Sequence, residues 1–130
     1  MSDRQIIVPS EMKLLYERAG YAPAVKVGKT LYCAGQVGRT SDLVVIEDPA
    51  QQIRAAWGNV KQVLAAGGCT FEDVVELTTY HVDMAHHLPL FRRIKDEIFP
   101  LGTCTWTCIG VSELARAGLL VEIKCIAVQR

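Results

Sequence analysis

The last apolar run of the chain, residues 119–128, constrains the fold more than any other segment. Alternate residues of a β-strand point to opposite faces of its sheet. One face of this run is wholly apolar, and the other is apolar except where it carries Glu122 and Lys124. A strand that favours burial on both faces belongs in a sheet that is covered on both sides. The apolar face consists of Leu119, Val121, Ile123, Cys125 and Ala127.

Alternating and β-branched residues predict four further strands upstream of this run. Gly28-Lys29 has glycine first, as a type II′ turn prefers, and would join the first two strands as a hairpin. The segment before residue 24 is expected to be irregular, and residues 37–45 are expected to form a loop or a short strand. The four strands are predicted at 24–27, 31–34, 74–82 and 103–111.

Two helices are predicted between the strands. The first has Asp48 as its N-cap and Pro49 at its first position, and it ends at Gly67. The second is expected to begin near Leu88, with Pro89 in its first turn. Two helices can cover only one face of a sheet, so a partner chain is expected to cover the other face.

Composition excludes several classes of protein. The 130 residues suit a single domain, 1–130. Fourteen basic and fourteen acidic residues give zero net charge without a basic block, so nucleic acid is not an expected partner. No apolar stretch approaches the ~20 residues of a membrane span, and no apolar signal core follows the amino terminus. We therefore expect a cytoplasmic protein with no membrane partner.

The cysteines and histidines do not predict a metal site. The five cysteines form an odd count in a chain without a secretion signal, so free thiols are expected. Cys104 and Cys108 would share a strand face but lie about 13 Å apart at ~3.3 Å per residue. His86-His87 lacks a further ligand at zinc spacing. Neither a metal nor another cofactor is predicted.

Five segments spread over almost the whole chain together resemble the RidA/YjgF (L-PSP) family. The resemblance implies an α+β, chorismate-mutase-like domain with a mixed sheet, two helices packed on one face, and a homotrimer with intersubunit clefts. It also implies cofactor-free deamination of a small enamine or imine ligand. The segments are Tyr21-Ala22-Pro23-Ala24-Val25, Ala34-Gly35-Gln36-Val37-Gly38, residues 59–68, Glu72-Asp73-Val74-Val75 and Leu120-Val121-Glu122-Ile123.

Glu122 and Tyr21 are the predicted catalytic residues. A carboxylate within an apolar strand needs a partner or a shifted pKa, and the resemblance implies that Glu122 orients or activates a water molecule. An ion pair with Lys124, two residues on, is the structural alternative. The resemblance places the Tyr21 hydroxyl against the ligand or its water, whereas an ordinary amphipathic tyrosine would pack its ring and expose its hydroxyl.

Gly35 and Cys108 are predicted to bind substrate. Gly35 would let a ligand approach backbone N–H groups at the end of a strand, and a plain bulge or turn is the alternative. The resemblance places Cys108 in the cleft. Inert packing of its thiol is the alternative, because no lysine or histidine lies close in sequence to lower its pKa.

Trp106 stands where deaminating members of the family have a substrate-binding arginine. Tryptophan has one N–H and an apolar face, so it cannot form the bidentate pair of a guanidinium with a carboxylate, and it favours a flat, apolar ligand. Filling the pocket is its alternative role. Arg92 is predicted to border the same cleft and to reach in from the side, or else to be a solvated helix residue.

The expected function is a RidA-like imine or enamine deaminase whose 2-imino-acid activity is weak because Trp106 replaces the arginine. A non-catalytic metabolite-binding or regulatory trimer is the alternative. Endoribonuclease activity, or translation inhibition, is disfavoured by the neutral charge.

Overall fold

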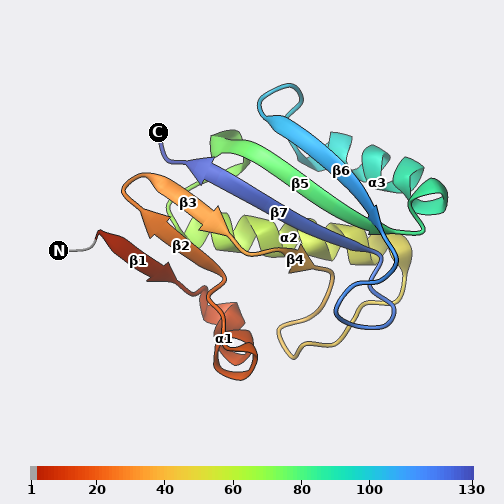
Figure 1. Cartoon of the computed structure of the whole chain (residues 1–130), viewed down its shortest axis with the longest axis horizontal. Helices are drawn as coiled ribbons and strands as arrows, with labels where there is room; N and C mark the ends of the chain where they lie inside the picture. Colours follow the sequence, from red (N-terminus) through yellow and green to blue (C-terminus); the bar gives the residue numbers. More distant parts are fainter. Residues whose placement is uncertain (1–2) are drawn as a thin grey trace.

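The computed structural model describes residues 3–130 as one mixed sheet with helices against it (Figure 1). The strand order is β1-β2-β3-β7-β5-β6. The short strand β4, which follows β3 in the chain, also pairs with β7. All pairs are antiparallel except β5 with β6. The strands are β1 (Arg4–Ile7), β2 (Ala24–Val27), β3 (Thr30–Cys33), β4 (Gln36–Val37), β5 (Val74–Val82), β6 (Thr105–Val111) and β7 (Val121–Val128).

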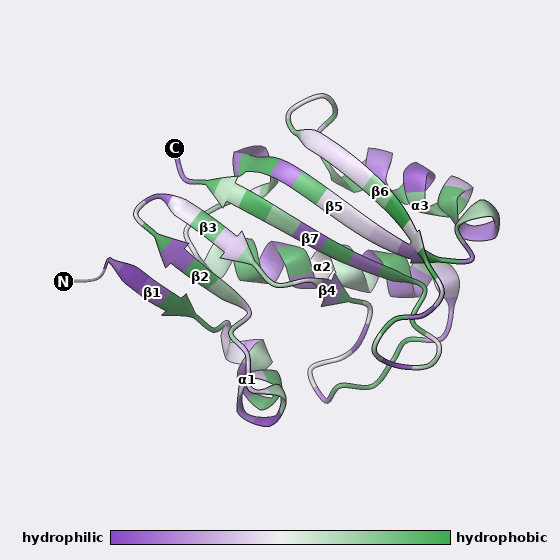
Figure 2. Ribbon diagram, in the orientation of Figure 1, coloured by the Kyte–Doolittle hydropathy of each residue, from purple (hydrophilic) through white to green (hydrophobic). Residues whose placement is uncertain are grey.

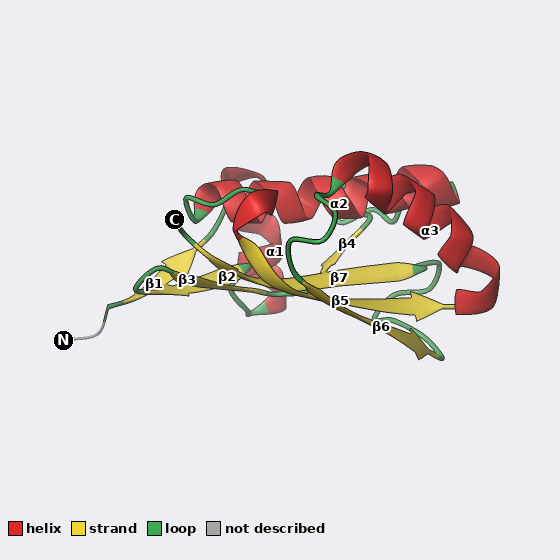
Figure 3. Cartoon of the chain, turned by 90° about the horizontal axis from the view of Figure 1, so that it is seen from above, coloured by secondary structure: helices red, strands yellow, loops and turns green. Residues whose placement is uncertain are grey.

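Two long helices cover one face of this sheet (Figure 3). They are α2 (Pro49–Ala66) and α3 (Met84–Ile98). The shorter α1 (Lys13–Ala19) lies beyond the end of β1, away from this layer (Figure 1). Single 3₁₀ turns occur at Ser10–Met12 and Phe71–Asp73. None of the helices in the described residues is long and apolar enough to cross a membrane.

The strand β7 is central, as its apolar pattern predicts. Val121, Ile123, Cys125 and Ala127 are at most 2% exposed beneath the helices. Figure 2 shows β7 as mostly hydrophobic, interrupted by hydrophilic positions. These hydrophilic positions belong to the opposite face, where Lys124 is exposed and Glu122 is half-buried.

The face opposite α2 and α3 is open over parts of β2, β3, β6 and β7. It carries exposed apolar side chains on β2, β3, β6 and β7, and together they form a surface of the kind that marks an interaction site. These side chains are Val27, Tyr32, Ile109 and Val128, between 37% and 50% exposed.

The predicted start of α2 is confirmed. The side chain of Asp48 accepts a hydrogen bond of 3.0 Å from the Gln51 backbone N–H, Pro49 occupies the first turn, and the helix ends at Ala66 before Gly67. Its inner face carries Trp57, which packs at 5.1 Å from Phe99 and 6.0 Å from Phe91 between ring centroids. These rings form the core between α2, α3 and the sheet.

The predicted start of α3 is wrong. The helix begins at Met84, four residues before Leu88, and Pro89 lies inside it. The carbonyl of Asp83 accepts bonds from the N–H groups of His86 and His87, which closes the first turn early. Pro89 is tolerated because the carbonyl that its missing N–H would have paired, that of residue 85, lies on an exposed part of the helix.

The expectation of an irregular amino-terminal segment is also wrong, because this segment forms β1 and α1. β1 is a polar edge strand with Ile7 as its single buried residue, and α1 buries only Leu15 in its seven residues. So few buried positions give no periodic signal. The predicted bounds of β2 and β5 are confirmed, and those of β3, β6 and β7 differ from prediction by one or two residues. Gly28 has the positive φ, 60°, that its hairpin turn requires.

Candidate functional site

Glu122, Gly35 and Tyr21 line one pocket of about 410 Å³ at the end of β7. Val37 on β4 pairs with Glu122 on β7. This pairing places the segment that follows β3 next to the Glu122 carboxylate. A Cβ atom added to Gly35 would lie 2.7 Å from Cδ of Glu122, so only glycine leaves room for the carboxylate in this position. We call this the Glu122 pocket. Its lining comprises Leu15, Arg18, Ala19, Tyr21, Gly35, Val37, Arg39, Asp42, Leu43, Ala115, Arg116, Leu119 and Glu122.

Burial raises the pKa of the Glu122 carboxyl group, and the nearby charges of Arg39 and Lys124 oppose this rise. Within residues 3–130 no ion pair joins Glu122 to Lys124, whose side chain is exposed. The alternative role of Glu122, an ion pair with Lys124, is therefore not found in residues 3–130. A half-buried carboxylate with a raised pKa is a better proton acceptor than a fully exposed one.

Side chains of α2 hold the walls of the Glu122 pocket. The Asn59 amide donates to the carbonyls of Val37 (2.8 Å) and Arg39 (3.1 Å). The buried Gln52 amide donates to the Gly118 carbonyl at 2.9 Å and accepts from the Leu120 N–H at 2.6 Å. The segments on both sides of Glu122 are thus fastened to one rigid helix.

Arg39 is a pocket residue that the sequence analysis did not identify. Its guanidinium lies 3.4 Å from the Tyr21 hydroxyl, to which it donates. The residue follows the segment that contains Gly35, but nothing in the sequence indicates that the chain then turns back over β7. Arg18 and Arg116 complete a group of three arginines around the pocket.

Trp106 and Cys108 lie on the opposite face of the sheet from Glu122. Trp106 is in register with Leu77, and Cys108 with Thr79, on the face that α3 covers. Glu122 is in register with Tyr80 on the open face. Within one chain, the predicted site residues therefore form two groups.

The indole of Trp106 is held in a network of buried groups. Its Nε1–H donates to the Thr79 hydroxyl at 2.9 Å, and that hydroxyl lies 2.7 Å from Nε2 of His81. Burial lowers the pKa of His81, so its imidazole is neutral at pH 7. The His81 ring meets Phe91 edge to face at 4.7 Å. We call Thr79, His81, Phe91, Lys95 and Trp106 the Trp106 cluster.

Two cations of α3 lie beside the indole. Lys95, only 8% exposed, has its Nζ atom 4.6 Å from the Trp106 ring centroid and 5.3 Å from that of Phe99. Both contacts are within cation–π range. Arg92 is exposed, and its Cζ atom is 6.0 Å from the Trp106 ring. Within one chain the structure thus places Arg92 beside Trp106 as an exposed helix residue, and away from the Glu122 pocket.

The Cys108 thiol is half-buried and lies 3.5 Å from Sδ of Met84. All five cysteines are free thiols. Three of them, Cys33, Cys69 and Cys125, are buried in the core. No group of three or more metal-ligating side chains lies together in residues 3–130.

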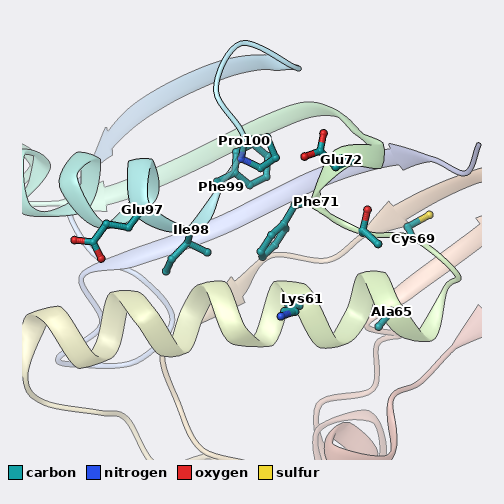
Figure 4. Close-up of a pocket in the computed structure, with 10 residues that line it drawn as sticks. Lys61, Ala65, Cys69, Phe71, Glu72, Glu97, Ile98, Phe99 and Pro100 are labelled. Carbon is teal, nitrogen blue, oxygen red and sulfur yellow. The ribbon is translucent and has the colours of Figure 1, made fainter.

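A further groove, of about 490 Å³, lies between the C-terminal ends of α2 and α3 (Figure 4). Phe71, Ile98 and Phe99 form its apolar floor, and the Glu97 carboxylate at its rim is paired with Arg54 at 2.8 Å. Burial raises the pKa of Cys69 in this groove, which keeps its thiol protonated and unreactive. The groove therefore offers mainly packing surface, and Lys61 and Glu72 are the further charged residues of its lining.

Comparison with known proteins identifies the family. Residues 12–129 match the family described as Endoribonuclease L-PSP. The chain belongs to this family, also known as RidA/YjgF. It is 37% identical over 128 residues to the RutC family protein YjgH of Escherichia coli K12, covering 98% of this chain and 96% of that protein. It is 34% identical over 113 residues to a protein of Dermatophagoides farinae named 2-iminobutanoate/2-iminopropanoate deaminase, covering 83% and 84% of the two chains.

Solved structures of this RidA/YjgF family share the fold. A structure of protein YjgH superposes with a TM-score of 0.90 at 36% identity, over 98% of this chain and 97% of that one. RidA from the Antarctic bacterium Psychrobacter sp. PAMC 21119 superposes with a TM-score of 0.77 at 26% identity, over 83% and 87% of the two chains. The mixed α+β architecture is therefore that of the family.

Proposed function

We propose that the chain is a cytoplasmic imine or enamine deaminase-type hydrolase of small metabolites, with Glu122 as its base. The observation that carries the proposal is the half-buried Glu122 carboxylate, whose pKa burial raises, facing a pocket beside Gly35 and Tyr21. Relatives named 2-iminobutanoate/2-iminopropanoate deaminase, from Dermatophagoides farinae and from mouse at 33% identity, support this reaction class.

The proposed chemistry adds water across a C=N bond. The Glu122 carboxylate accepts a proton from water as the water oxygen bonds to the imine carbon, and the imine nitrogen takes a proton from solvent water. The proton held by Glu122 then passes to the amino nitrogen and the C–N bond breaks. Ammonia leaves as the hydroxyl group returns its proton to solvent water and becomes the carbonyl. Tyr21 would orient the water or the substrate, and backbone N–H groups near Gly35 would stabilise developing negative charge.

We further propose that the pocket is completed in a homotrimer. Exposed apolar side chains on the uncovered face of the sheet support self-association. β6 is an edge strand, so it is free to border the Glu122 pocket of a neighbouring subunit, with Trp106 and Cys108 forming the far wall of the cleft. Light scattering should report three times the 14.3 kDa of one chain, and a monomer would contradict the intersubunit site.

Activity on 2-imino acids should be slow compared with relatives that carry the arginine at the Trp106 position. Loss of a partly desolvated charge partner typically costs about 2–5 kcal/mol, and the indole N–H that would replace it is already bound to Thr79. This arrangement also favours the second candidate, a metabolite-binding trimer without catalysis. Endoribonuclease activity is not proposed, because the net charge is zero.

The test uses 2-iminobutyrate, generated in the assay from threonine by a dehydratase, and measures its disappearance above the uncatalysed rate. Glu122→Gln should lower the catalysed rate by about 100-fold or more. Glu72→Gln, an exposed glutamate in the groove of Figure 4, is the matched control and should retain the wild-type rate. Equal rates for wild type and Glu122→Gln would favour the non-catalytic trimer.

A further inference from the structure

Three guanidinium groups surround the Glu122 pocket without a carboxylate partner. Arg18, Arg39 and Arg116 all line it, and within residues 3–130 none of them forms an ion pair with an acidic side chain. Two carboxyl groups, Asp42 and Glu122, line the same pocket, so the cations outnumber the acids by one. A concave site with unpaired guanidinium groups attracts anions.

Arg39 is the most specifically positioned of the three. Arg18 lies in the last turn of α1, where a cation is also favoured by the helix dipole, and Arg116 lies on an exposed loop. Arg39 is half-buried, and its backbone is held by the Asn59 amide and by an antiparallel bridge to Val45. A side chain on a fixed backbone loses less freedom when it binds a ligand.

The Arg39 guanidinium lies at the chemically relevant end of the pocket. It contacts the Tyr21 hydroxyl at 3.4 Å, which leaves most of its five N–H donors available. Its charge also acts on the Glu122 carboxyl group, whose pKa it lowers against the effect of burial. A ligand anion bound to Arg39 would therefore lie beside both predicted catalytic side chains.

We infer that Arg39 binds the carboxylate of an anionic substrate or product in the Glu122 pocket, in place of the arginine that is absent at position 106. This inference rests on the proposed function of the same pocket, and it assigns the residue that holds the substrate carboxylate there. Arg39 is half-buried and shared with Tyr21, so its hold on a carboxylate is weaker than that of a dedicated bidentate arginine. The expected slow activity is consistent with this difference.

Arg92 is the rival anchor for the carboxylate. It is exposed, and it lies over Trp106 on the face of the sheet opposite Glu122. Within one chain it does not line the pocket that contains Glu122. If Arg39 is the anchor, removing Arg39 should weaken carboxylate binding and removing Arg92 should not. If Arg92 is the anchor, the reverse should hold.

The experiment measures binding of 2-oxobutyrate, the product of 2-iminobutyrate hydrolysis, and of its neutral amide by calorimetry. The wild-type protein should bind the carboxylate more tightly than the amide. Arg39→Gln should weaken carboxylate binding by about 10- to 100-fold and abolish that preference. Arg39→Lys should retain part of it as a point charge. Arg93→Gln, an exposed arginine of α3, is the matched control and should bind like wild type.

The inference would be overturned if Arg39→Gln bound 2-oxobutyrate as tightly as wild type, or if Arg92→Gln lost carboxylate binding instead. A wild-type protein that does not prefer the carboxylate to the amide would overturn it as well. A second readout is the pH profile of kcat/KM, whose acid limb should move to higher pH in Arg39→Gln because Glu122 loses a nearby positive charge. Arg39-dependent binding without turnover would refute the proposed function alone. Glu122-dependent turnover with an unchanged KM in Arg39→Gln would refute the inference alone.

Discussion

The Glu122 pocket and the Trp106 cluster lie on opposite faces of the sheet, and their chemistry is opposite too. In the cluster, the indole N–H, the Thr79 hydroxyl and the His81 imidazole satisfy one another in the interior. In the pocket, a half-buried acid lies near three arginines that form no ion pair with an acidic side chain in residues 3–130. A satisfied network specifies structure, whereas unsatisfied charges in a cavity indicate binding or catalysis.

The largest expected effect comes from a comparison of two glycines, Gly35 in the Glu122 pocket and Gly110, which is in register with His81 of the Trp106 cluster. In Gly35→Ala the new methyl group would overlap the Glu122 side chain, 2.7 Å from its Cδ atom, and displace the carboxylate. Hydrolysis of 2-iminobutyrate should fall by about 10- to 100-fold, since a displacement of ~1 Å can have that effect. In Gly110→Ala on β6, the nearest atom is the flexible end of Met84 at 3.4 Å, so the rate should stay within about twofold. Equal losses in both variants would remove the distinction between the regions.

The second effect concerns stability, and here the substitution in the Trp106 cluster should have a larger effect than the substitution in the Glu122 pocket. Trp106→Phe removes the bond from Nε1 to the Thr79 hydroxyl and weakens the contact with the Lys95 ammonium. It should lower the free energy of unfolding by about 1–2 kcal/mol. Tyr21→Phe changes a residue that is 41% exposed, so its effect should stay within about 0.5 kcal/mol. Urea unfolding at a fixed protomer concentration measures both, and a larger loss in Tyr21→Phe would contradict the comparison.

The smallest effects are pH-dependent, and they have opposite signs in the two regions. Burial raises the pKa of Glu122 above its usual 4.5, so the ionised form costs stability above that pH, and Glu122→Gln should raise the Tm at pH 7 by about 1–3 °C. This gain should vanish as the pH falls below about 4.5.

Burial lowers the pKa of His81 below its usual 6.5, so protonation of the unfolded chain destabilises the fold as the pH falls through that value. His81→Gln should reduce this loss on the acid side. Thermal melts from pH 4 to pH 8 test both signs. If Glu122→Gln raised the Tm by the same amount at every pH, the Glu122 carboxyl group would have the same pKa in the folded and unfolded states.

Much of the fold follows from local preferences in the chain. The cap at Asp48, the hairpin at Gly28 and the alternation along β7 are each read over a few residues, and each predicts its element correctly. The start of α3 was misplaced because Pro89 is more often found in a first turn than in the interior. β1 and α1 were missed because each buries a single residue.

Local patterns in the sequence also predict part of the candidate site. An acid within an apolar strand marks Glu122, and period-two alternation correctly places Trp106 and Cys108 on a common face. Alternation within one strand does not say how the faces of two distant strands are related. That relation depends on the register of β6 and β7 on β5, and a slip of one residue would reverse it.

The chain's own pattern of residues therefore determined that Glu122 is an anomalous acid and that β7 has a wholly apolar face to bury. Tertiary structure decided that Trp106 faces α3, that Glu122 faces the other way, and that Arg39 joins Glu122 in one pocket. The physical reason is the range of the interactions. Caps, turns and alternation act over a few residues, whereas pairing across the sheet and packing against α2 bring together groups that are far apart in the chain.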